Sequence, residues 1–276
     1  MKKNTKTRLF YIHTPKTGGT SVNQYFMKVY PETALVHVEA DLKKETNLDL
    51  SKYDFISGHL TFPAVSSLLD PSWRKMVTFR EPYSFVVSHM CWIRRLADED
   101  QRENFQKHPE NIQKIAVKMK EFDFSIAGDI RSFISWLEEF GFSYLHNTQT
   151  IFMSPKKNIK RALLNLDSVE FVGTLERLDD FLAYVSYKLS LELTFHGAPI
   201  ANVNRRNYGF NIDDTETRKE LYPLIKKDIV LYDAALKRLD KDILSCKGFS
   251  VELPLGKKTF LHNLRLMEKI KNFKFY

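Results

Sequence analysis

The chain has 276 residues, enough for one large domain or two small ones, and 43% of them are hydrophobic, enough for a buried core. Lys and Arg total 42 against 34 Asp and Glu, so the formal net charge is +8. This positive charge suits binding to a polyanionic ligand or surface. It does not distinguish among a nucleotide, a nucleic acid, an acidic glycan and a membrane. Cys91 and Cys246, the two cysteines, exclude a disulfide framework and lack metal-ligand spacing, which indicates a reducing compartment.

The start of the chain shows no secretion or membrane signal. The apolar run at residues 9–12 is only about four residues long, shorter than the apolar region of a signal peptide and far short of the roughly 20 residues of a membrane span. We therefore expect a cytoplasmic protein.

The first predicted strand, residues 9–12, leads directly into the loop Pro15-Lys16-Thr17-Gly18-Gly19-Thr20-Ser21, and a segment with helical apolar spacing follows. The two glycines permit positive φ and close backbone approach, while Lys16 and the helix N-terminus attract an anion. Thr20 and Ser21 stand where helix caps are found and offer hydroxyl donors. This order predicts an anion-binding loop; the alternative is a plain Gly-rich turn capped by Ser or Thr.

Two more strands are predicted before residue 60. Residues 34–38 form a short one, in which His37 is interpreted as a structural or surface histidine, and residues 41–52 form a polar loop. Residues 53–59 form the second, which ends in His59. A histidine at the C-terminal end of a strand in an open α/β sheet points into the crevice where such folds bind ligands. His59 is therefore a candidate site residue, with a structural histidine as the alternative.

Residues 74–80 are predicted to form a buried strand that ends in Arg80, followed by a helix with Ser84 as its cap. Ser88 follows Arg80 by eight residues, so the two side chains can converge on one phosphate. The alternative is that Arg80 pairs with a carboxylate and that Ser88 is an inert helix residue.

The middle of the chain is predicted to be mostly helical. Residues 98–125 are highly charged and are interpreted as a solvated helical insertion, broken near Pro109; residues 130–140 form an amphipathic helix. The segment Asn147-Thr148-Gln149-Thr150 follows. Its amides can position a sugar, and a plain turn is the alternative.

The last third begins with a predicted strand over residues 171–178, which ends in a polar turn, and an amphipathic helix over residues 179–189. Arg205 and Arg206 follow in an irregular basic stretch. Residues 213–276 form a helical C-terminal region that ends in a basic, aromatic tail. That tail suits contact with an anionic membrane surface, and a docked terminal helix is the other interpretation.

Strands therefore alternate with helices, and both phosphate-binding segments lie at strand-to-helix turns. This order predicts an α/β fold with a central, mostly parallel sheet flanked by helices. We expect a single domain over residues 1–276.

The segment from His13 to Ser21 resembles the 5′-phosphosulfate loop of sulfotransferases that use 3′-phosphoadenosine 5′-phosphosulfate (PAPS), in the branch of heparan-sulfate 2-O-sulfotransferase and bacterial carbohydrate sulfotransferases. It differs from a Walker A loop because Lys16 precedes both glycines. Arg80 with Ser88 is similar to that family's 3′-phosphate site. The segments at residues 147–150 and 171–177 are also similar to segments of these enzymes, so the resemblance covers scattered blocks between residues 8 and 210.

The resemblance implies a P-loop-like sulfotransferase fold and transfer of a sulfuryl group from PAPS to a hydroxyl of a carbohydrate or glycolipid, without a metal. It implies that the donor is bound by Pro15, Lys16, Thr17, Gly18, Gly19, Thr20, Ser21, Arg80, Ser88, Arg205 and Arg206.

Catalytic and acceptor-binding roles follow from the same resemblance. Lys16 would stabilise charge on the bridging oxygen, and His59 would bind the acceptor and take up its hydroxyl proton, a role for which histidine is suited near neutral pH. Asn147 and Gln149 would position the acceptor. Animal members of this branch carry a second histidine where this chain has Ser57, so His146 is kept as an alternative base.

Two other function classes stay open. A nucleotide kinase would need a Mg²⁺-binding carboxylate and usually Gly-Lys-Ser/Thr, and neither is found in the sequence. A non-catalytic polyanion-binding module would explain the positive charge and would show steep salt dependence without preference for a 3′-phosphate. We expect a small-molecule nucleotide as partner and no nucleic acid.

Overall fold

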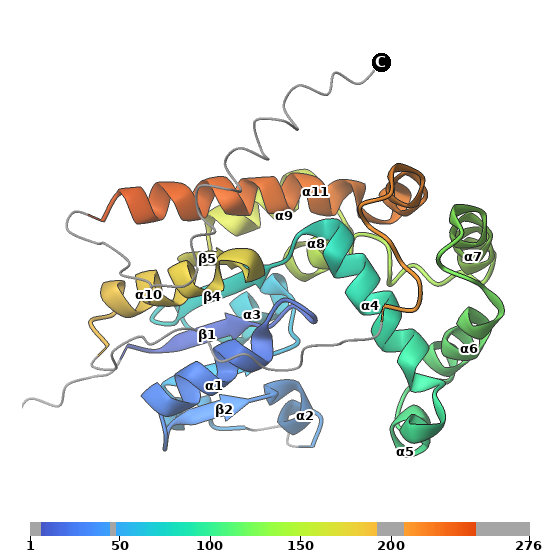
Figure 1. Cartoon of the computed structure of the whole chain (residues 1–276). Coiled ribbons are helices and arrows are strands. Elements are labelled where there is room, and N and C mark those ends of the chain that lie inside the picture. Colours follow the sequence, from blue (N-terminus) through green and yellow to red (C-terminus); the bar gives the residue numbers. More distant parts are fainter. Residues whose placement is uncertain (1–6, 45–47, 192–206, 247–276) are drawn as a thin grey trace, which may run out of the picture.

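A computed structural model describes residues 7–44, 48–191 and 207–246. Its centre is a five-stranded, all-parallel sheet with the strand order β2-β3-β1-β4-β5 (Figure 1). The strands are β1 (Leu9–Ile12), β2 (Ala34–Val36), β3 (Phe55–Gly58), β4 (Arg74–Phe79) and β5 (Phe171–Thr174). The structure therefore confirms the predicted α/β fold with a parallel sheet flanked by helices.

β1 is the middle strand, and its register aligns the carboxyl ends of the sheet. Ile12 pairs with Gly58 of β3 on one side and with Val77 of β4 on the other. Every residue of β1 is fully buried, as expected for a strand covered on both faces. Residues that directly follow β1 and β3 are therefore neighbours, and the His13 N–H donates to Gly58 O at 3.0 Å.

Alternate strand residues separate two apolar cores. Leu9, Tyr11 and Phe55 face one side of the sheet, where α1 (Gly19–Val29) and α10 (Leu178–Lys188) cover them. Phe10 and Ile56 face the other side. The helices on that side are α3 (Phe62–Leu68), α8 (Thr148–Met153), α9 (Ile159–Asp167) and α11 (Thr215–Leu244).

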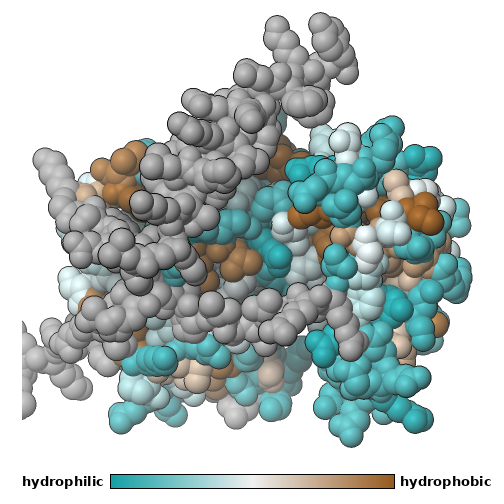
Figure 2. All heavy atoms as spheres, in the orientation of Figure 1, coloured by the Kyte–Doolittle hydropathy of each residue, from teal (hydrophilic) through white to brown (hydrophobic). Residues whose placement is uncertain are grey.

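A third core lies to one side of the sheet, where α4 (Pro82–Leu96) packs against α6 (Glu110–Lys118) and the first half of α11, and α7 (Ala127–Glu139) packs against α11 (Figure 1). The charged stretch 98–125 holds η2 (Glu99–Gln101), α5 (Arg102–Gln106), α6 and η3 (Met119–Glu121). Its apolar residues Ile112 and Ile115 are buried in this core, so the stretch is solvated on one side only. Figure 2 shows a largely hydrophilic surface over α5.

Two predicted strands end earlier than the sequence indicated, because helices begin there. β2 stops at Val36, His37 adopts a positive φ of 62°, and α2 (Val38–Leu42) begins within the predicted strand and loop. The predicted strand at 171–178 ends at Thr174, where η4 (Leu175–Arg177) begins, and η1 (Leu50–Lys52) lies in the predicted loop.

The helix caps differ from those predicted. α1 begins after Gly18, so Thr20 and Ser21 lie in its first turn and do not cap it. α4 begins at Pro82, and Glu81 replaces Ser84 as its cap by accepting the Ser84 N–H at 2.7 Å. Proline favours the first helical position because its N–H would be unpaired there and its φ is already helical.

The longest helix, α11, has 30 residues and contains Pro223. Across the described ranges, no helix has both the length and the apolar character of a membrane span. Arg205, Arg206 and the basic tail after residue 246 lie outside the described residues.

Candidate functional site

Four basic side chains follow strands at the carboxyl edge of the sheet. His13 directly follows β1, His37 follows β2, His59 follows β3 and Arg80 follows β4. In an open parallel sheet, ligands bind at this edge, close to the point where the strand order reverses. The order here reverses at β1, with β3 on one side and β4 on the other, so the loops after these strands frame the candidate site.

The loop after β1 turns sharply before α1. Lys16 and Gly18 both have positive φ, of 64° and 85°, and Gly18 is the left-handed cap of the helix. Gly19 serves a different purpose, because a Cβ at that position would lie 1.8 Å from Nε2 of His13. The glycine therefore lets the His13 ring pack directly against the start of α1.

Thr17 is held inside the protein. Its hydroxyl donates to Thr14 O at 2.7 Å and lies 3.1 Å from the hydroxyl of Thr78 on β4, which in turn bonds Tyr11. Burial raises the pKa of Tyr11 to about 12, so the network stays protonated. The Thr17 side chain thus fixes the loop to β4, and its role in donor binding stays a prediction.

Arg80 reaches the loop from the neighbouring strand. Its guanidinium donates through Nη1 to Lys16 O at 3.4 Å. Gln149 fixes its backbone, since the side-chain oxygen accepts the Arg80 N–H at 2.8 Å and the amide donates to Arg80 O at 2.9 Å. Glu176 accepts the next backbone N–H, that of Glu81, also at 2.8 Å. Gln149 therefore positions Arg80, and its role in acceptor binding stays a prediction.

Positive charge accumulates around Lys16. Burial lowers the pKa of its amine, and the charges of Arg80 and Arg95 lower it further, against an opposing effect of Cys91. Burial also lowers the pKa of Arg80, while Glu176 and Glu81 act in the opposite direction. An anion bound between these side chains would raise both pKa values, because a nearby negative charge favours the charged form of each cation.

One face of α4 adds to this region. Ser88, Cys91 and Arg95 are spaced three, four and seven residues apart, which places them on one face of the helix. Ser88 is half-buried and Arg95 is exposed, whereas burial raises the pKa of the Cys91 thiol to about 12. Sequence reasoning missed Cys91 and Arg95, although their helical spacing from Ser88 was the available signal.

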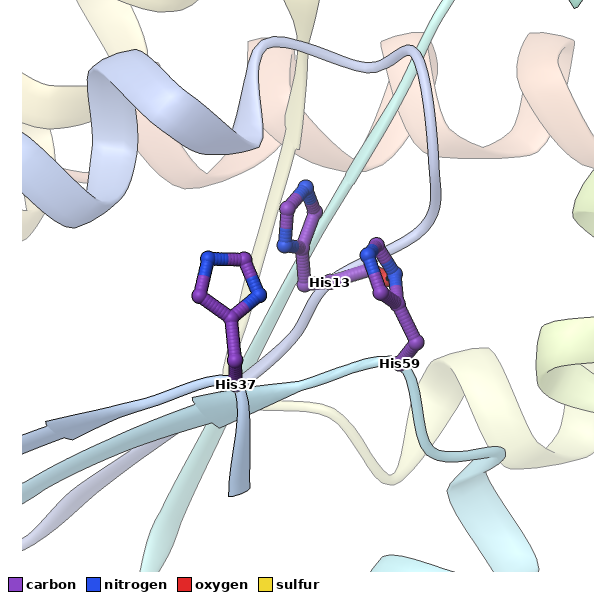
Figure 3. A group of neighbouring side chains, drawn as sticks. All are labelled: His13, His37 and His59. Carbon is purple, nitrogen blue, oxygen red and sulfur yellow. The ribbon is translucent and has the colours of Figure 1, made fainter. Parts of the chain in front are cut away.

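Three histidines meet at the same edge of the sheet, beside the loop (Figure 3). His13, His37 and His59 each offer a ring nitrogen, and these nitrogens lie within 4.8 Å of one another. Nδ1 of His59 bonds His13 O at 2.7 Å, and the two rings are 4.2 Å apart between centroids. Burial lowers the pKa of His13 to about 3, with His59 and His37 acting in the same direction, so His13 is neutral near pH 7.

Asn147 is turned towards α11. It has a positive φ of 53°, its N–H donates to Leu224 O at 2.6 Å, and its side-chain oxygen accepts the Lys227 N–H at 2.7 Å. These bonds engage the amide oxygen within the fold, and the role of Asn147 in acceptor binding stays a prediction. Nε2 of His146, the alternative base, lies 3.6 Å from Oε1 of Glu138 on α7.

Neither a scan against protein-family models nor a search of curated proteins finds a match to this chain. Function is therefore inferred from the chemistry and placement of these residues, together with the motif resemblance.

Proposed function

We propose that this protein is a sulfotransferase that transfers a sulfuryl group from PAPS to an acceptor hydroxyl, on a P-loop-like fold. The observation that carries the proposal is the contact between the Arg80 guanidinium and the backbone of the Lys16 loop. The contact joins the two segments that resemble the 5′-phosphosulfate and 3′-phosphate sites, which lie on adjacent strands of the sheet.

Donor binding in this proposal uses the loop and the start of α1. The N-terminus of α1 carries a partial positive charge that attracts anions, and Lys16 adds a full charge. The hydroxyl-bearing residues Thr20 and Ser21 lie in that first turn. Arg80 would take the 3′-phosphate, for which its planar fork is suited, with Ser88 as second ligand.

His59 is the proposed base. Its Nδ1 donates to His13 O, so the lone pair is on Nε2, which is available to accept a proton. The acceptor oxygen would lose its proton to this nitrogen and gain the sulfuryl group, and adenosine 3′,5′-bisphosphate would leave. Lys16 would stabilise the negative charge on the leaving oxygen. His13, which directly follows β1, supplies a second imidazole close to His59, and Ser57 lies on the neighbouring strand β3.

The acceptor in this proposal is a carbohydrate or glycolipid hydroxyl, by the motif resemblance alone. Cys91 and Cys246 are both free thiols, which fits the cytoplasm as the proposed location.

Thermal unfolding with adenosine 3′,5′-bisphosphate, ADP and ATP at equal concentration and ionic strength tests the donor site. At a hundred times its Kd, a ligand specific for the folded state adds about 2.7 kcal/mol of stability. We expect a clear midpoint shift with the bisphosphate alone. Equal shifts with all three nucleotides, or none, would overturn the proposal and favour a kinase or a polyanion-binding module.

The Arg80→Ala variant sharpens this test. It should lose most of the bisphosphate shift yet unfold at nearly the same midpoint without ligand, because Gln149 binds only the backbone of residue 80. Arg161→Ala, which removes an exposed arginine on α9, is the matched control and should keep the full shift.

A further inference from the structure

The histidine cluster has the composition of a metal site. Its members follow β1, β2 and β3, which are neighbours in the sheet, so three separate strand ends deliver one imidazole each. A zinc ion bound by histidines at 2.0–2.1 Å holds the ligating nitrogens roughly 3.4 Å apart. The nitrogens here lie within 4.8 Å of one another, so rotation of the side chains of His37 and His59 would bring them into range.

His13 contributes a buried nitrogen without a partner. Its side chain is only 6% exposed, and Nδ1 has no hydrogen-bond partner in the described part of the chain. Nε2 cannot change places with it freely, because that atom packs against Gly19. Figure 3 shows the His13 ring between those of His37 and His59. Leaving such an atom unpaired costs free energy, and a metal ion bound at the cluster would compensate that cost.

The other two histidines are oriented by neighbouring oxygen atoms. Nδ1 of His59 donates to His13 O, and Nδ1 of His37 lies 3.7 Å from Oε1 of Glu39. Oε2 of Glu39 also accepts the His59 backbone N–H at 2.9 Å. Metal-ligating histidines usually donate their second ring N–H to a carbonyl or carboxylate, which leaves Nε2 for the metal. Glu39 therefore lies beside His37 and holds the backbone of His59.

Gly58 explains how this carboxylate fits against the sheet. A Cβ at this last residue of β3 would lie 2.5 Å from Oε2 of Glu39. Any larger residue would displace Glu39 from the His59 backbone, so the glycine makes room for the carboxylate that holds this backbone.

We propose that His13, His37 and His59 bind one divalent transition-metal ion of the zinc class. The ligand set is three neutral imidazoles, which suits Zn²⁺, Co²⁺, Ni²⁺ and Cu²⁺ and not the oxygen-preferring Mg²⁺ and Ca²⁺. Three protein ligands leave the fourth tetrahedral position open to a solvent molecule or another ligand.

Metal binding has a consequence that rests on the proposed function. The ion would occupy Nε2 of His59, which is the nitrogen assigned to proton acceptance. Bound metal and base catalysis would then exclude each other at His59, so Zn²⁺ would inhibit sulfuryl transfer. The metal site itself does not depend on that activity.

Titration of the untagged full chain with Co²⁺, followed by visible absorption, tests the site. We expect one tetrahedral Co²⁺ per chain, displaced by an equivalent of Zn²⁺. His37→Asn should weaken Co²⁺ binding at least ~10-fold, the lower end of the loss seen when even an outer-shell partner is removed. Asn tolerates the positive φ of position 37, so the fold should persist.

His108→Asn, outside the cluster, is the matched control and should bind Co²⁺ like the parent chain. His59→Gln gives a second variant should His37→Asn fail to fold, and it should also lose the spectrum. Absence of saturable binding by the parent, or binding unchanged in both cluster variants, would overturn the metal site. The bisphosphate shift is a separate readout, so the failure of either proposal is recognised independently of the other.

Discussion

At the scale of single residues, the two glycines of the loop are needed for different reasons. Gly18 adopts a left-handed conformation that other residues reach at a cost, whereas Gly19 is helical and is needed because the His13 ring approaches it closely. Gly128, in the first turn of α7, has neither constraint, since an added Cβ there would meet nothing within 4 Å.

These differences predict opposite effects of the same substitution. Gly19→Ala should lower the free energy of unfolding by about 1–3 kcal/mol, the usual cost of inserting atoms into a packed site, because His13 is buried and cannot move aside freely. Gly128→Ala should raise it by about 0.5–1 kcal/mol through helix propensity. Urea unfolding of the two variants measures both values, and a Gly19→Ala variant as stable as the parent would contradict the packing described.

Lys16 carries the second prediction at this scale. Lys16→Ala should lower sulfuryl-transfer turnover by roughly 100-fold or more, since one electrostatic donor to a developing charge commonly contributes that much. Affinity for adenosine 3′,5′-bisphosphate should change far less. Steady-state rates with PAPS and isothermal titration with the bisphosphate separate the two effects, and an unchanged turnover would remove Lys16 from the mechanism.

The roles of individual residues were harder to predict from the sequence than their location. The sequence predicted ligand-binding roles for Thr17, Asn147 and Gln149, and the structure adds for each a hydrogen-bond partner 61 to 80 positions away. The sequence does not reveal such partners because they depend on strand order and helix packing. The histidine cluster was missed for the same reason, since its members follow three different strands.

At the scale of elements, α4 has two functional faces. Ser88 and Arg95 lie on one face, from which the charge of Arg95 acts on Lys16. His89 lies on another face and is buried against the rings of Phe85 and Tyr144. Burial lowers the pKa of His89 to about 3, and the charge of Lys16 acts in the same direction. The helix thus carries a neutral histidine in the interior of the third core.

This histidine predicts acid sensitivity. Between pH 6.5 and about 3 the unfolded chain binds a proton that folded His89 does not, so the free energy of unfolding should fall as pH decreases, by about 1.4 kcal/mol per pH unit from this group. In His89→Phe this contribution should disappear, leaving a shallower slope. Urea unfolding at pH 7, 6 and 5 measures it, and equal slopes for both chains would contradict the assignment.

Most elements could be predicted because their apolar patterns are local. The apolar runs predicted all five strands, with ends that match for β1 and differ by one to a few residues for the others, and the helical stripes predicted the position of α4, α7, α10 and α11. α3 and α9 were not predicted. Both are short, with 7 and 9 residues, so neither has enough turns for a clear helical stripe in the sequence.

At the scale of the whole molecule, β1 is the central strand of the sheet, and the loop of the candidate site follows it directly. This strand pairs on both sides and is covered on both faces, so its backbone should open only when the entire chain unfolds. β2 is an edge strand of 3 half-buried residues. The strand order was not predictable from the sequence, because pairing between strands depends on contacts between distant parts of the chain.

Native-state hydrogen exchange tests whether β2 opens more readily than β1. The amides of Phe10 to Ile12 should exchange with the free energy of global unfolding, whereas those of β2 should exchange faster through local opening. Similar exchange rates in the two strands would contradict this difference between β1 and β2.

The way in which Gln149 holds Arg80 has an evolutionary consequence. Because the glutamine recognises only main-chain atoms of position 80, the path of the turn after β4 does not depend on which side chain stands there. Substitutions at position 80 can therefore alter what is bound without disturbing the turn. Mutations at this position can therefore change ligand specificity during evolution without loss of the fold.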